Sequence, residues 1–254
     1  AHINTDEGGA PERVMGLKLL TVDPPAGPLP PALIDQQAWG WGDEHRAQPL
    51  AVSITNTTEL GTLYSVAEIR AIADHVHERG MLLHLDGARI GNAAAALGVS
   101  LRELTTDAGV DILSLGGTKN GLLYGEAVVV LTPAASDGLV YLRKLTMQLA
   151  SKMRFLSAQL IALYEGDLWL RSAGHANAMA ARLRSALEAL ALPGLSFSQE
   201  TTANAVFAVL DNAANATANL NTTIVAAQPV VTNLAAISEQ LRSPGGPLTW
   251  ALGT

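Results

Sequence analysis

Two short motifs place a carboxylate and a primary amine directly after predicted strands. In HLDGAR (residues 84–89) a strand runs into a glycine turn that carries Asp86 and Arg89, and in SLGGTKNG (residues 114–121) another strand runs into a loop with Lys119. Ligands of open parallel sheets bind outside the carboxyl ends of the strands, so both motifs are predicted to open onto one crevice. This pair suits pyridoxal phosphate, because the lysine can form a Schiff base with its aldehyde and the aspartate can keep its pyridine nitrogen protonated.

Each motif also has a plainer interpretation. Asp86 could cap a helix that starts near Ala88, and Lys119 could be a solvated loop lysine. The glycines around Lys119 could form turns or cradle a phosphate, although their spacing is not that of a nucleotide P-loop. His84 lies two residues before Asp86 and therefore on the same face of the strand, where we expect it to pack or to support the site.

The elements around these motifs indicate an α/β fold. Predicted strands cover residues 50–55, 81–85, 111–115 and 126–132, and capping boxes at Ser65–Glu68 and Ser100–Glu103 begin helices between them. Strand–helix–strand units normally form a parallel sheet flanked by helices. From about residue 137 to residue 190 leucines recur at helical spacing, punctuated by Gly166 and Gly174, which predicts a long helix over residues 137–163. Residues 204–210 are predicted to form a further strand.

Composition excludes several classes of protein. The chain has 254 residues, 48% of them apolar, so a disordered chain is excluded. A net charge of −7 argues against a nucleic-acid surface, and no apolar run approaches the ~20 residues of a membrane-spanning helix. Without cysteine the chain has no disulfide and no thiolate ligand. His75 and His77 do not share a helix face, so we expect both to be solvated, and no histidine spacing indicates a metal site.

The run HLDGARIGNAAAALGVSLRELTTDAGVDILSLGGTKNGLLYGEAVVVL (residues 84–131) resembles the low-specificity L-threonine aldolases, which are also classed as β-eliminating lyases. Further similar segments, including AHINTDEGGAPE at the start of the chain, extend the resemblance over residues 1–210. The resemblance implies fold type I of the pyridoxal-phosphate enzymes, similar to aspartate aminotransferase. It also implies that Lys119 binds the cofactor aldehyde, Asp86 pairs with the pyridine nitrogen, Arg89 lies near the cofactor oxygen and the substrate carboxylate, and His2 stacks on the ring and moves the β-hydroxyl proton.

The family implies an activity and an organisation. The activity is retro-aldol cleavage of threonine, allo-threonine or a related β-hydroxy amino acid to glycine and an aldehyde, with another β-eliminating lyase reaction as the alternative. We expect a partial cofactor-binding domain (1–135), a long connecting helix (136–165), a partial small domain (166–210) and a divergent tail (211–254). The resemblance also implies a cytoplasmic enzyme that binds an amino-acid substrate, assembles as a dimer or tetramer and has no nucleic-acid partner.

Two departures from the family pattern lead to further expectations. Family members have an upstream portion that binds the cofactor phosphate, so we expect a truncated chain with weak or absent activity. Residues 211–254 carry only three charged residues and faintly resemble the helical C-terminal region of MCE-type lipid-transport proteins. A fused or altered chain end is the plainer interpretation of this tail, and lipid contact is the less favoured one. An inactive chain whose remaining role is association is the alternative to an enzyme.

Overall fold

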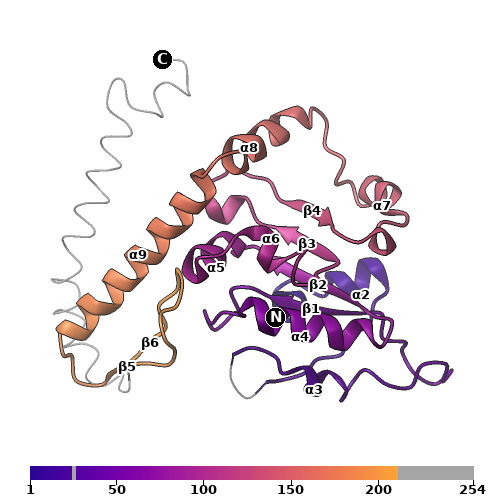
Figure 1. Ribbon diagram of the computed structural model, residues 1–254, viewed down its shortest axis with the longest axis horizontal. Coiled ribbons are helices and arrows are strands. Elements are labelled where there is room, and N and C mark those ends of the chain that lie inside the picture. Colours follow the sequence, from indigo (N-terminus) through magenta and orange to yellow (C-terminus); the bar gives the residue numbers. More distant parts are fainter. Residues whose placement is uncertain (25–26, 211–254) are drawn as a thin grey trace. The chain divides into compact units, whose positions relative to one another are not determined.

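The computed structural model describes residues 1–24 and 27–210, and its centre is a four-stranded sheet (Figure 1). The strand order follows the sequence: β1 (Ala51–Thr55), β2 (Leu82–Gly87), β3 (Ile112–Leu115) and β4 (Ala127–Val130). The first three strands are parallel, as predicted, whereas β4 runs antiparallel to β3. The reason is the connection, because parallel neighbours need a crossover of a dozen or more residues, usually a helix, and residues 116–126 contain only one short 3₁₀ turn, η1 (Thr118–Asn120).

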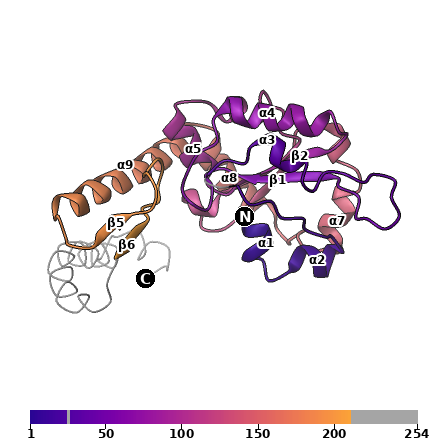
Figure 2. The same ribbon diagram turned by 90° about the horizontal axis from the view of Figure 1, so that it is seen from below.

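Three helices between the strands supply one side of the core. They are α4 (Val66–His77), α5 (Ile90–Leu97) and α6 (Leu101–Leu104), and the predicted capping boxes begin α4 and α6. Figure 2 shows α4 on one side of the sheet, with α1 (His2–Thr5) and α2 (Ala10–Met15) on the opposite side. A further short helix, α3 (Pro31–Ile34), precedes β1. The fully buried core side chains come mainly from α4, β2 and the helices next to them: Ile69, Ile72, Val76, Leu83, Leu85, Ile90 and Leu104.

Alternation along β2 separates this core from the other face of the sheet. Leu83 and Leu85 are buried against the helices, whereas His84 and Asp86 point to the opposite, half-buried face. His84 and Asp86 therefore share a face, as their spacing predicts.

Of the two histidines of α4 that we expect to be solvated, His77 is exposed, as expected, whereas His75 is partly buried, and each contacts a carboxylate. His75 Nε2 lies 2.9 Å from Asp35 Oδ1, and His77 Nε2 lies 2.7 Å from the buried Asp111 Oδ2. The carboxylates come from residues 40 and 34 positions away in the chain, so spacing within α4 gives no indication of these contacts.

The single long helix expected over residues 137–163 is also wrong. The structure has η2 (Pro133–Ala135), α7 (Leu139–Leu145), α8 (Arg154–Tyr164) and α9 (Leu168–Ala189). Between α7 and α8, Met147 and Lys152 have positive φ angles of 60° and 59°, which end the α-helical path. Gly166 does separate α8 from α9, but Gly174 lies inside α9.

The chain divides into two compact units. The first comprises residues Ala1–Ala189 with Phe197–Phe207, and the second, among the described residues, comprises Leu190–Ser196 and Ala208–Leu210. Strands β5 (Leu195–Phe197) and β6 (Ala208–Leu210) pair as a small sheet, so the strand expected over residues 204–210 is confirmed only for its last three residues. The expectations about the tail, residues 211–254, lie outside the described residues. Among residues 1–24 and 27–210, no helix combines the length and the apolar character that crossing a membrane requires.

Candidate functional site

The ends of β2 and β3 bring the two sequence motifs together. Gly87 and Leu115 are register partners, and the Gly116 N–H donates to the Gly87 carbonyl oxygen at 3.1 Å. Gly116 packs so tightly that a Cβ there would lie 2.6 Å from the carbonyl carbon of Ala88. Glycine at this position therefore allows the loop after β3 to lie directly on the loop after β2.

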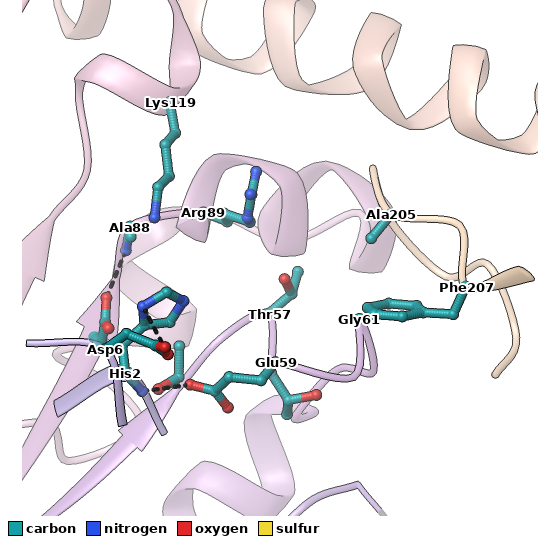
Figure 3. A pocket seen from close by; sticks show the side chains of 13 residues that line it. His2, Asp6, Thr57, Glu59, Gly61, Ala88, Arg89, Lys119, Ala205 and Phe207 are labelled. Carbon is teal, nitrogen blue, oxygen red and sulfur yellow. Dashed lines mark hydrogen bonds and ion pairs between the residues drawn. The ribbon is translucent and has the colours of Figure 1, made fainter. Parts of the chain in front are cut away.

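A cavity of about 320 Å³ opens beside this junction, within the first unit. His2, Asp86, Arg89 and Lys119, the four residues that the sequence analysis selects, all line it. Figure 3 shows the Lys119 ammonium pointing from η1 toward Ala88, with the His2 ring nearby. The remaining lining residues come from the end of β1 and the loop after it, from the turn after β2, from the residue that ends α1 and from the segment before β6: Asp6, Thr55, Thr57, Thr58, Glu59, Gly61, Ala88, Ala205 and Phe207.

Asp86 is held by the turn that follows its strand. Its Oδ1 accepts the Ala88 N–H at 3.0 Å, and its carbonyl oxygen accepts the Asn56 N–H at 3.0 Å. The helix-cap interpretation of Asp86 fails, because α5 begins at Ile90 and its N-cap residue is Arg89. One carboxylate oxygen thus fixes the local turn, and the carboxylate lines the cavity.

His84 lies under the site in a row of polar side chains that crosses three strands. Its Nδ1 lies 2.8 Å from Ser53 Oγ on β1, and its Nε2 lies 3.0 Å from Ser114 Oγ on β3. Burial lowers the pKa of His84 and outweighs the opposing effect of Asp86 on the same face. A neutral imidazole with both nitrogens engaged ties β1, β2 and β3 together, in keeping with a supporting role for His84.

His2 reaches the cavity from the first turn of the chain. Its backbone N–H donates to Glu59 Oε1 at 3.0 Å, and its ring Nδ1 lies 3.4 Å from Asp6 Oδ2. The contact with Asp6 orients the imidazole, and the contact with Glu59 fixes α1 on the loop after β1. Arg89 also lines the cavity, but its guanidinium points away from Asp6 and Glu59 (Figure 3).

Several residues that line the cavity were not predicted from the sequence. Asp6, Glu59 and Thr57 bring polar groups to the cavity, and Ala205 and Phe207 close it with apolar ones. The segments around Asp6 and Glu59 carry the family resemblance, which is the signal that could have found them. For Phe207 no local signal exists, because its partner, Gly61, is far away in the sequence: a Cβ on Gly61 would lie 2.8 Å from the Phe207 ring.

The loop that carries Lys119 contacts side chains that the motif does not contain. Glu126 accepts the N–H groups of Gly117 and Thr118, and the Tyr164 hydroxyl donates to the Gly116 carbonyl oxygen. Burial, with the nearby Glu126 charge, raises the pKa of Tyr164 to about 12, so its hydroxyl stays a donor near neutral pH. Among residues 1–24 and 27–210, no group of three or more histidine or acidic side chains is arranged to hold a metal ion.

Comparison with known proteins gives consistent results. The family model described as beta-eliminating lyase matches residues 1–213. A low specificity L-threonine aldolase from Pseudomonas sp. is 46% identical over 208 residues, which cover 82% of this chain and 60% of the relative. The Pseudomonas aeruginosa protein of the same description is 45% identical over 215 residues, covering 84% of this chain and 62% of the relative. This chain thus spans about three-fifths of the length of these relatives.

Solved structures of other proteins have the same fold as this chain. The threonine aldolase of Leishmania major superposes with a TM-score of 0.78 at 33% identity, over 87% of this chain and 63% of that one. A Listeria monocytogenes protein described as a putative L-allo-threonine aldolase gives a TM-score of 0.61 at 16% identity, over 80% of this chain and 54% of that one, and shows the fold alone. The predicted α/β architecture, with a mainly parallel sheet flanked by helices, is confirmed.

Proposed function

Because this chain belongs to the beta-eliminating lyase family, we propose that it carries the site for retro-aldol cleavage of threonine, allo-threonine or a related β-hydroxy amino acid to glycine and an aldehyde. The observation that carries the proposal is that Lys119, Asp86, Arg89 and His2 line the same cavity. The 46% identity to a low specificity L-threonine aldolase supports this reaction over other lyase reactions.

The side chains that line the cavity fit the reactive groups of pyridoxal phosphate, its aldehyde and its pyridine nitrogen. Lys119 offers the amine that would bind the cofactor aldehyde, and Asp86 offers the carboxylate that would hold the proton on the pyridine nitrogen. When bound, the cofactor supplies an electron sink for the charge that develops at Cα as the Cα–Cβ bond breaks. The protein holds the reacting groups in place around that bond.

Other residues of the chain would move the proton, bind the substrate and hold Asp86 in place. The His2 ring, oriented through Nδ1 by Asp6 at 3.4 Å, presents its Nε2 as the atom that takes the proton of the substrate β-hydroxyl. Arg89 provides the positive charge that attracts the substrate carboxylate. The Ser53–His84–Ser114 row holds β2 in place, so that Asp86 stays directed at the cavity.

A titration with pyridoxal phosphate tests the proposal directly. The full chain should develop a visible absorbance band on addition of the cofactor, and Lys119→Ala should abolish it. Lys18→Ala is the matched control, because Lys18 is exposed, lies outside α7 and does not line the cavity. A chain without a lysine-dependent band refutes cofactor binding.

The product identifies the reaction. Release of glycine from threonine or phenylserine supports retro-aldol cleavage, whereas release of pyruvate from serine supports the second candidate, a β-eliminating lyase. We expect glycine release to exceed pyruvate release. The reverse order replaces the first proposal with the second.

We also propose that the chain forms a homo-oligomer through α7 and the turn after it. Val140, Tyr141, Leu145 and Met147 are 65 to 87% exposed, and such clustered apolar side chains are typical of contact surfaces. Light scattering of the full chain tests this proposal, with a double substitution, Tyr141→Ser with Leu145→Ser, expected to yield monomers. A monomer before substitution refutes it, and also refutes association as the chain's alternative role.

A further inference from the structure

Lys119 lies in the middle of a single 3₁₀ turn. One such turn does little to fix the position of a side chain that must reach the cofactor aldehyde. The loop runs from Gly116, at the end of β3, to Glu126, directly before β4, and η1 (Thr118–Asn120) is its only regular element. The first N–H groups of a helical turn have no partner within the turn. In this loop two of them, on Gly117 and Thr118, point at one side chain.

That side chain is Glu126. Its Oε2 accepts the Gly117 N–H at 2.8 Å, and its Oε1 accepts the Thr118 N–H at 3.2 Å. Hydrogen bonds to an ionised acceptor are stronger than neutral ones, and the negative charge lies where the partial positive charge of the turn's N-terminus is concentrated. Both carboxylate oxygens therefore accept hydrogen bonds from the two residues that directly precede Lys119.

Glu126 is itself anchored to the sheet. Its neighbour Ala127 is the register partner of Leu115 at the end of β3. Within the loop, Thr118 Oγ1 accepts the Gly125 N–H at 3.1 Å, which closes the loop on itself one residue before Glu126. The Glu126 carboxylate thus links the end of the sheet to the start of the lysine-bearing turn, while Trp169 and Ser172 hold the end of the turn at Asn120.

We propose that Glu126 is a positioning residue for Lys119: its carboxylate fixes the turn that directs the ammonium group into the cavity. Glu126 is absent from the cavity lining, whereas Lys119 is part of it, so Glu126 acts only through the loop. This inference rests on the proposed function, because it assigns Glu126 a part in the reaction of Lys119 with pyridoxal phosphate.

The geometry sets the size of the expected effect. A displacement of about 1 Å in a reacting group can slow a reaction by roughly 100-fold. Glu126→Ala removes both hydrogen bonds, so we expect the covalent reaction of Lys119 with the cofactor to slow by about 10- to 100-fold. Glu126→Gln keeps one acceptor oxygen, so its rate should lie between those of Glu126→Ala and the unsubstituted chain.

The test measures covalent capture rather than turnover. The full chain is incubated with saturating pyridoxal phosphate, reduced with borohydride at timed intervals, and the adduct on the peptide containing Lys119 is quantified by mass spectrometry. The control is Glu103→Ala, because the Glu103 carboxylate also accepts a backbone N–H, from Ser100 at 2.7 Å, but in the capping box of α6. Glu103→Ala matches the loss of a carboxylate–amide hydrogen bond and leaves the Lys119 loop unchanged.

The outcomes separate this inference from the function on which it rests. Support requires slow capture in Glu126→Ala, partial recovery in Glu126→Gln, an unchanged rate in Glu103→Ala, and faster amide exchange across residues 116–125 of Glu126→Ala without cofactor. Capture by both Glu126 variants at the unsubstituted rate overturns the inference and leaves the proposed function intact. If the unsubstituted chain gives no adduct on Lys119, the proposed function fails, and the inference fails with it.

Discussion

Replacement of Gly116 by alanine is the sharpest test of the contact between the two motif loops. A Cβ at Gly116 would lie 2.6 Å from both Cα and the carbonyl carbon of Ala88, whereas real Cβ contacts essentially never fall below 3.0 Å. The obstacle is backbone, so no side-chain rotation relieves it. The loop after β3 must move away from the loop after β2 by several tenths of an ångström, and the 3.1 Å hydrogen bond from Gly116 to Gly87 must lengthen.

The cost follows from these two contacts. Overpacking of a tight interior site costs about 1–3 kcal/mol, and loss of one backbone hydrogen bond adds about 1 kcal/mol. We therefore expect Gly116→Ala to lower the free energy of unfolding by about 3 kcal/mol, which corresponds to a melting temperature roughly 6–12 °C lower for a chain of this size. Since the shifted loop carries Lys119, covalent capture of pyridoxal phosphate should also slow by up to about 100-fold.

Gly174→Ala is the matched control for this substitution. Gly174 lies inside α9, and a Cβ there would meet no atom within 4 Å. Alanine is favoured over glycine in a helix by about 0.5–1 kcal/mol, so this variant should melt slightly higher and capture the cofactor normally. Thermal unfolding followed by circular dichroism, together with borohydride trapping, measures both effects. A Gly116→Ala variant as stable and as reactive as the unsubstituted chain refutes the assigned loop contact.

Two further predictions concern groups around the sheet. Burial opposes ionisation of Asp111, but hydrogen bonds from the Leu83 amide, His77 and Thr132 outweigh it and lower its pKa. Asp111 therefore stabilises the fold above the unfolded carboxyl pKa of about 4 and loses this effect as pH falls through its lower folded value. Urea unfolding from pH 7 to pH 3 should show the deficit of Asp111→Asn shrinking with acid, and a constant deficit contradicts the assignment. Tyr164→Phe leaves the Gly116 carbonyl without its donor, so we expect it to lower the free energy of unfolding by about 1–2 kcal/mol. The loss should be equal at pH 6 and pH 9, because the pKa of Tyr164 is about 12. Urea unfolding at both pH values measures it, and an unchanged stability excludes the hydrogen bond.

Local pattern was sufficient for much of the architecture. The spacing of apolar residues predicted the four strands of the main sheet, and the capping boxes at Ser65 and Ser100 fixed the starts of α4 and α6. Both signals lie within a few residues of the element that they predict, because strand alternation and helix capping are short-range effects. The order of the two motifs, with the rule that ligands bind at the carboxyl ends of parallel strands, also predicted that Asp86 and Lys119 share one crevice.

Contacts between distant residues were beyond the reach of such patterns. The carboxylate partners of His75 and His77 lie on segments that only folding brings together. Glu126 is the clearest case for function, since in sequence it is only the residue before a strand, and its bonds to the Lys119 loop appear only in three dimensions.

The sequence alone thus determined which chemical groups are available, an amine, a carboxylate, a guanidinium and an imidazole, and to which family they point. The tertiary structure decided how they are held. The close approach of Gly116 to Ala88, the carboxylate of Glu126 and the hydroxyl of Tyr164 hold the loop that carries Lys119. The physical reason is that a reactive group is identified by its own chemistry, whereas its position is set by the contacts of its neighbours, which are rarely its neighbours in sequence.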